Sequence, residues 1–259
     1  MRHEKALLDK RQNLSEYLLM IQTIVTHECS KCGSINLVKN GHDYKGSQKY
    51  HCKACGSYGT LDSWRGYSPA VRAQIKRGLL ERVSLRGLAR MLALSRRTIG
   101  RWLEAWVAQV PPLHTSLLPA RLDDVLEVDE LWSFVGNKQQ QRWVWLALCR
   151  RTRQVIAYWI GDRSEAGALQ LWRRIPHEYV CCASFSDCWQ PYRFIFDPQR
   201  HRMVGKEDGE TNHVERWFNT LRQRLARFTR KTLAFSKRDD LHDGLLRMFI
   251  YDYNLSCIS

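Results

Sequence analysis

The chain has 259 residues, among them 41 Lys or Arg and 26 Asp or Glu, so its formal net charge is +15. This length is enough for one or two domains, each with a packed core. No segment reaches the roughly 18 consecutive apolar residues of a membrane helix, and residues 1–25 lack the apolar core of a signal peptide. These observations exclude a membrane partner, and we expect a cytoplasmic protein.

The positive charge is concentrated in the first half of the chain. Residues 1–120 hold 19 basic and 8 acidic side chains (net +11), whereas residues 121–259 hold 22 and 18 (net +4). A basic excess on one part of a protein is typical of a surface that binds a polyanion. The charge distribution therefore favours a nucleic acid such as DNA as the partner of the first half.

Four of the nine cysteines form two CxxC pairs, Cys29 with Cys32 and Cys52 with Cys55, and 19 residues separate the pairs. Each pair places two thiolates on one tight turn, and the spacing is typical of a four-thiolate zinc ribbon. A redox-active CxxC motif is the alternative, but it would not need two copies. We predict a structural Zn²⁺ that all four cysteines hold in a ribbon over residues 27–62.

The segment of residues 63–109 has the pattern of three helices with a basic surface. Ser95 is a suitable N-cap for a helix that begins at Arg96. In the resulting helix-turn-helix pattern, Arg96, Arg97 and Arg101 lie near the exposed start of the recognition helix, where such helices contact DNA. The alternative is a basic helical bundle that only links two domains.

A linker with three prolines, residues 110–120, precedes a further domain that we expect over residues 121–259. Apolar runs and helical spacing predict its elements: strands at 124–135, 142–149, 154–160 and 179–185, and a helix at 165–175. Three antiparallel strands, a helix and a strand parallel to the first are the order of an RNase H-like fold. We therefore predict an α/β domain with a mixed sheet and helices.

Three acidic residues stand where this fold would bring them together. Asp129 is on the first strand, Asp187 follows the fourth, and Glu215 is on a helix expected over residues 212–228. Converging carboxylates repel one another unless a cation neutralises them. Magnesium prefers such hard oxygen ligands, and two ions roughly 3.5–4 Å apart can support phosphoryl transfer. We predict that these acids hold Mg²⁺ in a catalytic domain.

Neighbouring acids leave alternatives open. They are Glu127 or Glu130 for Asp129, Asp197 for Asp187, and Glu207 or Glu210 for Glu215. On the first strand, Glu127 and Asp129 share one face and Glu130 takes the other. Asn212 and Glu215 also form a capping-box pattern, in which the Glu would only cap its helix. Arg222 lies two turns further along that helix, where it could contact a DNA strand beside the metals.

Two stretches of this domain carry a resemblance to a known family. They are Val128-Asp-Glu-Leu-Trp-Ser-Phe-Val-Gly-Asn-Lys138 and His213-Val-Glu-Arg-Trp-Phe-Asn-Thr-Leu-Arg-Gln-Arg-Leu225. With the zinc ribbon and helix-turn-helix before them, they resemble the insertion-sequence-one transposases in the InsA–InsB fusion form, over about residues 27–254. The resemblance implies a DDE transposase that binds the terminal inverted repeats of an insertion element through its N-terminal half. It also implies metal-dependent DNA cleavage and strand transfer.

The functional residues of the family carry over position by position. Asp129, Asp187 and Glu215 match the metal-binding triad, for Mg²⁺ or Mn²⁺, and Arg222 matches the basic residue after the Glu. The resemblance further implies a homo-oligomer that acts on element ends and target DNA, associated with the nucleoid of a bacterial or archaeal cell. Two features depart from the family: residues 1–26 are an N-terminal extension without an assigned function, and the chain is continuous where the two halves are often joined by a frameshift.

Two other functions are consistent with parts of the sequence. A DNA-binding regulator would use the ribbon and the helix-turn-helix to bind an operator, and its second half would only dimerise. Such a regulator would need no group of three acids and would not cut DNA. A structure-selective nuclease on the same fold would cut without joining, and it would hardly need a sequence-reading first half.

Overall fold

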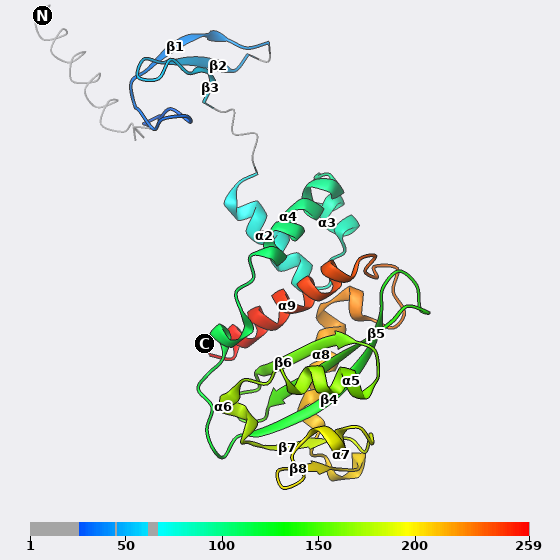
Figure 1. Cartoon of the computed structure of the whole chain (residues 1–259). Coiled ribbons are helices and arrows are strands. Elements are labelled where there is room, and N and C mark those ends of the chain that lie inside the picture. The colour runs from blue at the N-terminus through cyan, green and yellow to red at the C-terminus, as the bar shows by residue number, and fades with distance from the viewer. Residues whose placement is uncertain (1–25, 45, 62–66, 259) are drawn as a thin grey trace, which may run out of the picture. The chain divides into compact units, whose positions relative to one another are not determined.

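The computed structural model describes residues 26–44, 46–61 and 67–258 (Figure 1). The chain divides into two compact units, residues 1–68 and residues 69–259. The N-terminal extension expected over residues 1–26 lies outside the described residues, apart from its last position.

A three-stranded antiparallel sheet forms the first unit, in the order β1–β2–β3. The strands are β1 (Leu37–His42), β2 (Gln48–Cys52) and β3 (Tyr58–Thr60). Among the residues described in this unit, only Cys29 and Cys52 are buried, with 5% and 1% of their surface exposed. The unit therefore has almost no apolar core, which is typical of small modules that depend on a bound metal for stability.

Three helices open the second unit: α2 (Pro69–Leu80), α3 (Leu85–Met91) and α4 (Arg96–Ala108). Ser84 Oγ accepts a hydrogen bond from the Gly87 N–H at 3.0 Å and caps α3. Ser95 Oγ accepts one from the Thr98 N–H at 3.0 Å, so the cap predicted for α4 is confirmed. Four side chains with at most 2% exposure join the helices in one core: Ile75, Leu88, Ile99 and Leu103.

A five-stranded mixed sheet lies at the centre of the second unit, in the order β6–β5–β4–β7–β8. The strands are β4 (Val125–Phe134), β5 (Gln141–Cys149), β6 (Val155–Gly161), β7 (Ala183–Ser186) and β8 (His201–Met203). β4 pairs antiparallel with β5 and parallel with β7, and β5 pairs antiparallel with β6. This arrangement agrees with the predicted RNase H-like order of strands.

Helices cover both faces of the sheet (Figure 1). Those on one face are α5 (Glu165–Trp172), α6 (His177–Val180) and α7 (Tyr192–Ile195), and those on the other are α8 (Asn212–Arg224) and α9 (Asp239–Ser256). Short 3-10 turns are η1 (Leu113–Ser116), η2 (Lys206–Asp208) and η3 (Ala226–Phe228). None of the helices in the described part of the chain has both the length and the apolar character needed to cross a bilayer.

The alternation of side chains along β4 decides which residues face α8. Leu126 and Val128 pack on the α5–α7 side of the sheet, whereas Leu131 packs on the α8–α9 side. Because successive strand residues point to opposite faces, Glu127 and Asp129 share the face of Leu131. This was the prediction from the sequence, and the contacts of Glu127 with the start of α8 confirm it.

The fourth strand is shorter than the predicted range of residues 179–185. Its first residues belong to α6 and the following turn, and β7 begins at Ala183. Tyr179 is buried, and its hydroxyl donates a hydrogen bond to the Leu118 carbonyl at 2.8 Å. The prediction was wrong here because a short apolar run is compatible with either a buried strand or a buried helical turn, and distant contacts decide between them.

Two helices also end earlier than their apolar periodicity predicts. The helix expected at 165–175 ends at Trp172, and the one expected at 212–228 ends at Arg224. At Leu225 the backbone becomes extended (φ −112°, ψ 104°) before the turn η3. Apolar residues continue at helical spacing beyond the ends of both helices, so this spacing does not predict where the helices end.

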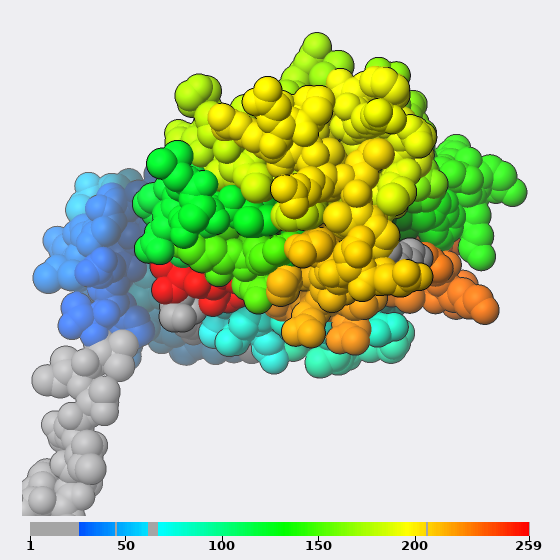
Figure 2. All heavy atoms as spheres, turned by 90° about the horizontal axis from the view of Figure 1, so that it is seen from below, coloured from blue at the N-terminus to red at the C-terminus, as the bar shows by residue number. Residues whose placement is uncertain are grey.

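The helices α2–α4 dock on the C-terminal helices of the same unit. The Arg82 N–H donates to the Arg224 carbonyl at 2.6 Å, and the Arg224 guanidinium pairs with Glu81 at 2.6 Å. Arg247 of α9 donates to the Val107 carbonyl of α4 at 2.7 Å. In Figure 2 the orange atoms of α8 and of the residues that follow it accordingly lie beside α2 and α3 (cyan to teal). The three helices thus share a hydrophobic core with α8 and α9.

The segment expected as a linker, residues 110–120, lies within the second unit, and the boundary between the compact units falls at 68/69. Gln154 holds this segment in place. Its Nε2 donates to the Ser116 carbonyl, and its Oε1 accepts from the Leu118 N–H, both at 2.8 Å. The segment is therefore bound to the sheet along its length.

Candidate active site

Three acidic side chains from three separate elements line one pocket of about 420 Å³ in the second unit. They are Asp129 on β4, Asp187 directly after β7, and Glu215 in the first turn of α8. β4 and β7 pair so that Val128 lies opposite Ser186, and the next residue of each strand is one of these acids. α8 packs against β4 and adds the third. The structure thus brings together the acids that the sequence singled out.

Burial and mutual repulsion disturb the ionisation of these acids. Burial is the main cause that raises the pKa of Asp129 to about 8. The negative charges of Glu130, Asp187 and Glu215 raise it further, while the Glu130 N–H, which donates to Asp129 Oδ1 at 2.7 Å, acts in the opposite direction. A divalent cation would remove the repulsion. Carboxylate oxygens are ligands that Mg²⁺ and Mn²⁺ prefer, so this set of residues fits such an ion.

Two arginines border the same pocket. Arg222 lies two turns beyond Glu215 on α8, and Arg230 follows the end of that helix. Burial lowers the pKa of Arg222, and the neighbouring charge of Arg230 lowers it further. The buried Arg222 Nε has no hydrogen-bond partner among the described residues. An anion such as a phosphate in this pocket would be attracted by both cations.

Sequence analysis missed Arg163 and Trp143, which also line the pocket. The Arg163 guanidinium lies 4.8 Å from the ring centroid of Trp143 and 5.5 Å from that of Trp189. It pairs with Glu130 at 2.6 Å, and the Tyr192 hydroxyl donates to the other oxygen of that carboxylate at 2.7 Å. These residues come from different strands and loops, so no local pattern marks them. Arg230 belongs to a stretch rich in basic residues, but the sequence did not predict that it lies beside the acids.

Four of the five acids that remained as alternatives have other partners, and the fifth, Glu207, is exposed in the turn η2. Glu127 and Glu210 both bind Arg150, at 2.8 and 2.7 Å. Asp197 accepts a backbone hydrogen bond in the turn before β8. Of these alternatives, all of which belong to the described residues, Glu130 alone lines the acidic pocket, and there it is paired with an arginine.

The capping-box alternative for Glu215 disagrees with the start of α8. The N-cap is Thr211 rather than Asn212, and no side chain at the N-cap forms the capping hydrogen bond. Two N–H groups in the first turn of α8 instead donate to the Glu127 carboxylate, at 2.9 and 3.0 Å. Glu215 is thus not needed as a cap, and its side chain lines the pocket.

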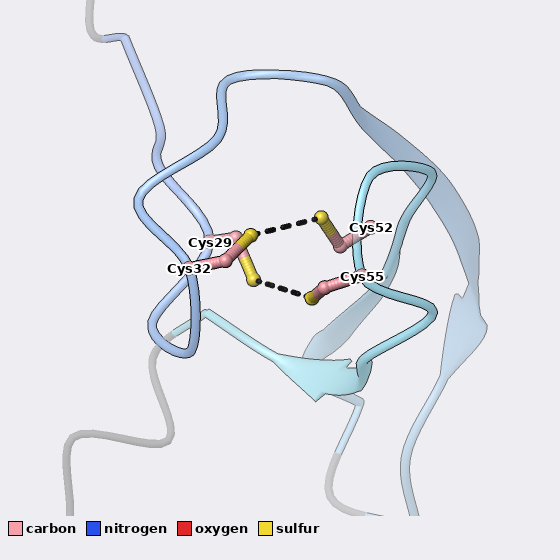
Figure 3. A group of neighbouring side chains, drawn as sticks. All are labelled: Cys29, Cys32, Cys52 and Cys55. Atoms are coloured by element: carbon pink, nitrogen blue, oxygen red, sulfur yellow. Dashed lines mark hydrogen bonds between the residues drawn. The ribbon is translucent and has the colours of Figure 1, made fainter.

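In the first unit the four predicted cysteine ligands converge, and the two pairs face each other in Figure 3. The four Sγ atoms lie within 4.8 Å of one another. Cys29 Sγ is 3.7 Å from Cys55 Sγ, and Cys32 Sγ is 3.6 Å from Cys52 Sγ. A tetrahedral zinc with Zn–S bonds of about 2.3 Å requires sulfur separations of about 3.8 Å, so the cluster fits zinc.

Backbone amides favour thiolates at Cys29 and Cys52, whereas contacts with the neighbouring thiols and burial raise the pKa of Cys32 to about 12. Hydrogen bonds from the Lys31 and Cys32 amides lower the pKa of Cys29 to about 6. A bond from the Cys55 amide is the main cause that lowers the pKa of Cys52. The glycine after each pair adopts a positive φ (71° and 70°), which closes the turn at little steric cost. Thiolates are the form in which cysteine binds a metal.

The three arginines predicted to contact DNA lie on the exposed side of α4. Arg96, Arg97 and Arg101 are exposed, whereas Ile99 and Leu103 on the same helix are 0% exposed and face the core. The helix therefore presents a basic face to solvent at its N-terminal half. A phosphate or a base edge could reach all three side chains.

Comparison with known proteins identifies the class of this chain. The family model of the IS1 transposase matches residues 124–255, from the start of β4 to the end of α9. The InsB protein of insertion element iso-IS1n from Shigella dysenteriae is 34% identical over 126 residues, which are 49% of this chain and 93% of that protein. The InsB protein of insertion element IS1 4 from Escherichia coli (strain K12) is 32% identical over 158 residues, 58% of this chain and 92% of that protein.

The match of this mixed α/β domain over its length to the IS1 transposase model and to the InsB proteins identifies the protein as a transposase. The chain belongs to the IS1 transposase family. Membership of this family implies an enzyme that cleaves DNA and transfers DNA strands.

Proposed function

We propose that this protein is a DDE transposase that binds the terminal inverted repeats of an insertion element and catalyses metal-dependent DNA cleavage and strand transfer. The observation that carries the proposal is the convergence of Asp129, Asp187 and Glu215 in one pocket bordered by arginines. None of the three forms an ion pair with another described residue. Acids that converge without a cationic partner are better explained as metal ligands than as structural ion pairs.

In this proposal Asp129, Asp187 and Glu215 hold Mg²⁺ or Mn²⁺ through their carboxylate oxygens. When bound, two such ions would activate the attacking oxygen, from water or from a DNA 3′-hydroxyl, and would neutralise charge on the leaving oxygen. The protein supplies the three carboxylates in one place and a partly buried surrounding that strengthens their attraction for cations. The pKa of Asp129, which burial and then the neighbouring acids raise, supports this role, because a bound cation would offset both effects.

We assign the binding of the DNA strand at this pocket to the surrounding cations. Arg222 and Arg230 would bind a backbone phosphate next to the acids. Arg163 is held by Glu130 and offers a further donor. Trp143 lines the pocket beside it, and an unstacked base could lie against the ring.

The first half of the chain supplies sequence recognition in this proposal. α3 and α4 form the helix-turn-helix, and Arg96, Arg97 and Arg101 contact the major groove or its phosphates. Cys29, Cys32, Cys52 and Cys55 hold one structural Zn²⁺. Because phosphate contacts release counterions, binding to the terminal repeats falls steeply as the salt concentration rises.

We further infer that the active form is a homo-oligomer. An insertion element has two ends, and each end needs a recognition module and a set of acids. The described part of one chain offers a single pocket in which the predicted triad meets. Two or more copies acting together would therefore bind and process both ends and the target.

The test uses the purified full-length protein, labelled element-end DNA and Mg²⁺. Asp129→Asn keeps the shape of the side chain but removes its charge, and it should abolish cleavage and strand joining while end binding remains. Glu215→Gln should behave in the same way. Asp123→Asn is the matched control, because Asp123 is exposed and does not line the pocket. Cleavage by folded Asp129→Asn at nearly the wild-type rate would overturn the assignment of the triad.

The same assay separates the two other functions. A regulator would bind end DNA and never cut it at any Mg²⁺ concentration. A nuclease would cut without joining the 3′-hydroxyl to target DNA. We expect both cleavage and joining by the wild type. A lack of cleavage would favour the regulator, and cleavage without joining would favour the nuclease.

A further inference from the structure

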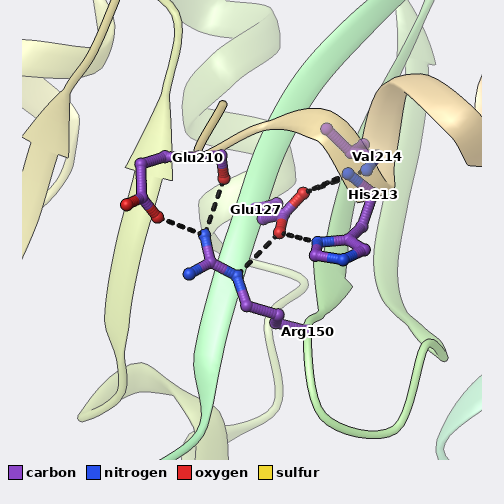
Figure 4. A network of polar contacts seen from close by, with 5 residues as sticks. All are labelled: Glu127, Arg150, Glu210, His213 and Val214. Atoms are coloured by element: carbon purple, nitrogen blue, oxygen red, sulfur yellow. Dashed lines mark hydrogen bonds and ion pairs between the residues drawn. The ribbon is translucent and has the colours of Figure 1, made fainter. Parts of the chain in front are cut away.

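Glu127 is a buried acid beside the proposed catalytic pocket that the mechanism above does not use. It lies on β4 two residues before Asp129 and is 0% exposed. Its Oε1 accepts a hydrogen bond from Arg150 Nε at 2.8 Å and lies 2.6 Å from His213 Nδ1. Its Oε2 accepts from the N–H groups of His213 and Val214, at 2.9 and 3.0 Å (Figure 4). One carboxylate thus contacts a side chain after β5 and the first turn of α8.

Arg150 extends this contact to further segments. It follows β5 directly, and its backbone N–H donates to the Val125 carbonyl of β4 at 2.8 Å. Its Nη2 donates to both the carbonyl and the carboxylate of Glu210, each at 2.7 Å. Its guanidinium lies over the ring of Phe185 on β7, 5.2 Å from the centroid. The Glu127–Arg150 pair therefore touches β4, β7 and the start of α8 at once.

In each of these three segments, the residue that belongs to the pair or contacts it lies one or two positions before a proposed metal ligand. Glu127 precedes Asp129 by two residues, Phe185 precedes Asp187 by two, and Val214 precedes Glu215 by one. β4 and β7 are paired at this level, with Glu127 opposite Phe185. Residues two apart on a strand point to the same face and lie about 6.8 Å apart, so a fixed first residue places the second.

We propose that Glu127 and Arg150 are a positioning pair that sets the mutual placement of Asp129, Asp187 and Glu215, and hence the affinity of the pocket for divalent metal. The inference rests on the proposed function of that pocket. Neither residue touches substrate or metal in this proposal. They act through the segments that carry the ligands.

Stability alone is a poor explanation for this arrangement. A buried ion pair contributes little net stability compared with apolar side chains of similar size, because desolvation offsets the attraction. The free N–H groups of a helix are usually satisfied by a local side-chain cap. α8 lacks that local cap, and a carboxylate from the neighbouring strand replaces it. The result couples the helix that carries one acid to the strand that carries another.

A closely matched pair that leads to no acid of the pocket lies directly before the same strand. Asp124 has a side chain that is 0% exposed and pairs with Arg151 at 2.5 Å. The Asp124 carboxylate also accepts from the Arg121 N–H at 2.8 Å, and Arg151 donates to the Pro119 carbonyl at 3.1 Å. This pair ties β4 to the segment before it. It provides a control for the loss of a buried carboxylate–arginine contact.

The experiment measures metal binding and activity separately on full-length protein. Mn²⁺ binding is followed by electron paramagnetic resonance, and the half-saturating Mg²⁺ concentration is taken from cleavage of labelled end DNA. Glu127→Gln leaves one acceptor oxygen in place of the two carboxylate oxygens that now accept hydrogen bonds. Arg150→Lys keeps the positive charge, but a lysine cannot contact Glu127 and Glu210 at the same time. Both variants should weaken Mn²⁺ binding and raise the half-saturating Mg²⁺ by about 10- to 100-fold. Asp124→Asn should lower the melting temperature and leave both metal measurements unchanged.

The outcomes separate this inference from the proposed function. If the wild type and Asp129→Asn bind the same amount of Mn²⁺, Asp129 is not a metal ligand. The proposed metal site is then wrong, and the positioning role fails with it. If that binding exists and both Glu127→Gln and Arg150→Lys keep wild-type Mn²⁺ affinity, only the positioning role is overturned. If Glu127→Gln does not fold, Arg150→Lys decides, because the Arg150 side chain is 30% exposed and the change is milder.

Discussion

Gly244 of α9 lies directly against Val107 of α4. A Cβ atom at Gly244 would meet Val107 Cβ at 2.7 Å and its two methyl groups at 3.0 and 3.1 Å. This close approach joins the three N-terminal helices of the second unit to the helix that covers the sheet, and it leaves no space for a side chain.

We expect Gly244→Ala to lower the free energy of unfolding by about 1–3 kcal/mol, because the added methyl group must push the two helices apart. In an ordinary helix the same change stabilises by roughly 0.5–1 kcal/mol. Gly100→Ala on α4 is the matched control, since no atom lies within 4 Å of a Cβ there. Urea unfolding of the two variants should give changes of opposite sign. Equal gains in both would show that the helices are not held together at this point.

Asp129 should stabilise the Mg²⁺-free protein less as the pH rises from about 4 to 8. The pKa of Asp129 is about 8 in the folded chain against a usual value of 3.8, so in this range the folded state holds a proton that the unfolded state has lost. For this group each rise in pH therefore favours unfolding, whereas His201 and His242, whose pKa values burial lowers from 6.5 to about 4, act in the opposite direction below about pH 6.5. Asp129→Asn should weaken this dependence and melt above the wild type at pH 8.5 in Mg²⁺-free buffer, as thermal scans at pH 5 and 8.5 can show. An Asn variant that melts below the wild type at pH 8.5 would contradict the prediction.

Zinc should be bound at one ion per chain and should be lost when a cysteine of the cluster is replaced. In Cys32→Ser a thiolate ligand is removed from a unit that has almost no apolar core, so both the metal and the fold of that unit should be lost. Cys188→Ser is the control, because Cys188 is exposed and lies outside the cluster. Metal analysis by mass spectrometry measures the content. Full zinc retention in Cys32→Ser would exclude the four-cysteine site.

Arg101→Ala should weaken binding to a terminal repeat by about 1–3 kcal/mol if the side chain contacts a guanine, and less if it contacts only phosphate. Its position on the exposed face of α4, opposite the buried Leu103, is the reason for the choice. Arg193→Ala removes the same charge from an exposed position on α7 and controls for the change in net charge. Fluorescence anisotropy at fixed salt gives both affinities. If the two variants bind equally well, α4 is not the recognition helix.

Much of the fold could be predicted because the signals are local. The helix start at Ser95 depends on a hydroxyl that bonds an amide three residues away, and Ser164 caps α5 in the same manner. The long strands β4 and β5 follow their apolar runs. The residues around Tyr179 could not be assigned in this way, because a helical turn and a strand bury the same short apolar run. A tertiary contact to the Leu118 carbonyl accompanies the helical turn there.

The candidate acids were predictable as a group, but their individual partners were not. Asp187 and Asp197 both follow apolar runs, and only the folded chain distinguishes the one beside β4 from the one in the turn before β8. Arg163 and Arg230 reach the pocket from loops that no periodic pattern marks. Their proximity to the acids results from packing between elements that are distant in the chain.

Sequence alone determined that the first strand carries Glu127 and Asp129 on one face, since alternation along a strand is a property of the backbone. It could not determine which of the two faces the pocket, because the two carboxylates are equivalent by pattern. The tertiary structure decided this: Arg150 binds Glu127 from 23 residues away and the first turn of α8 binds it from 86 residues away. Those donors satisfy Glu127, so Asp129 is the one left facing the other acids without an ion-pair partner among the described residues.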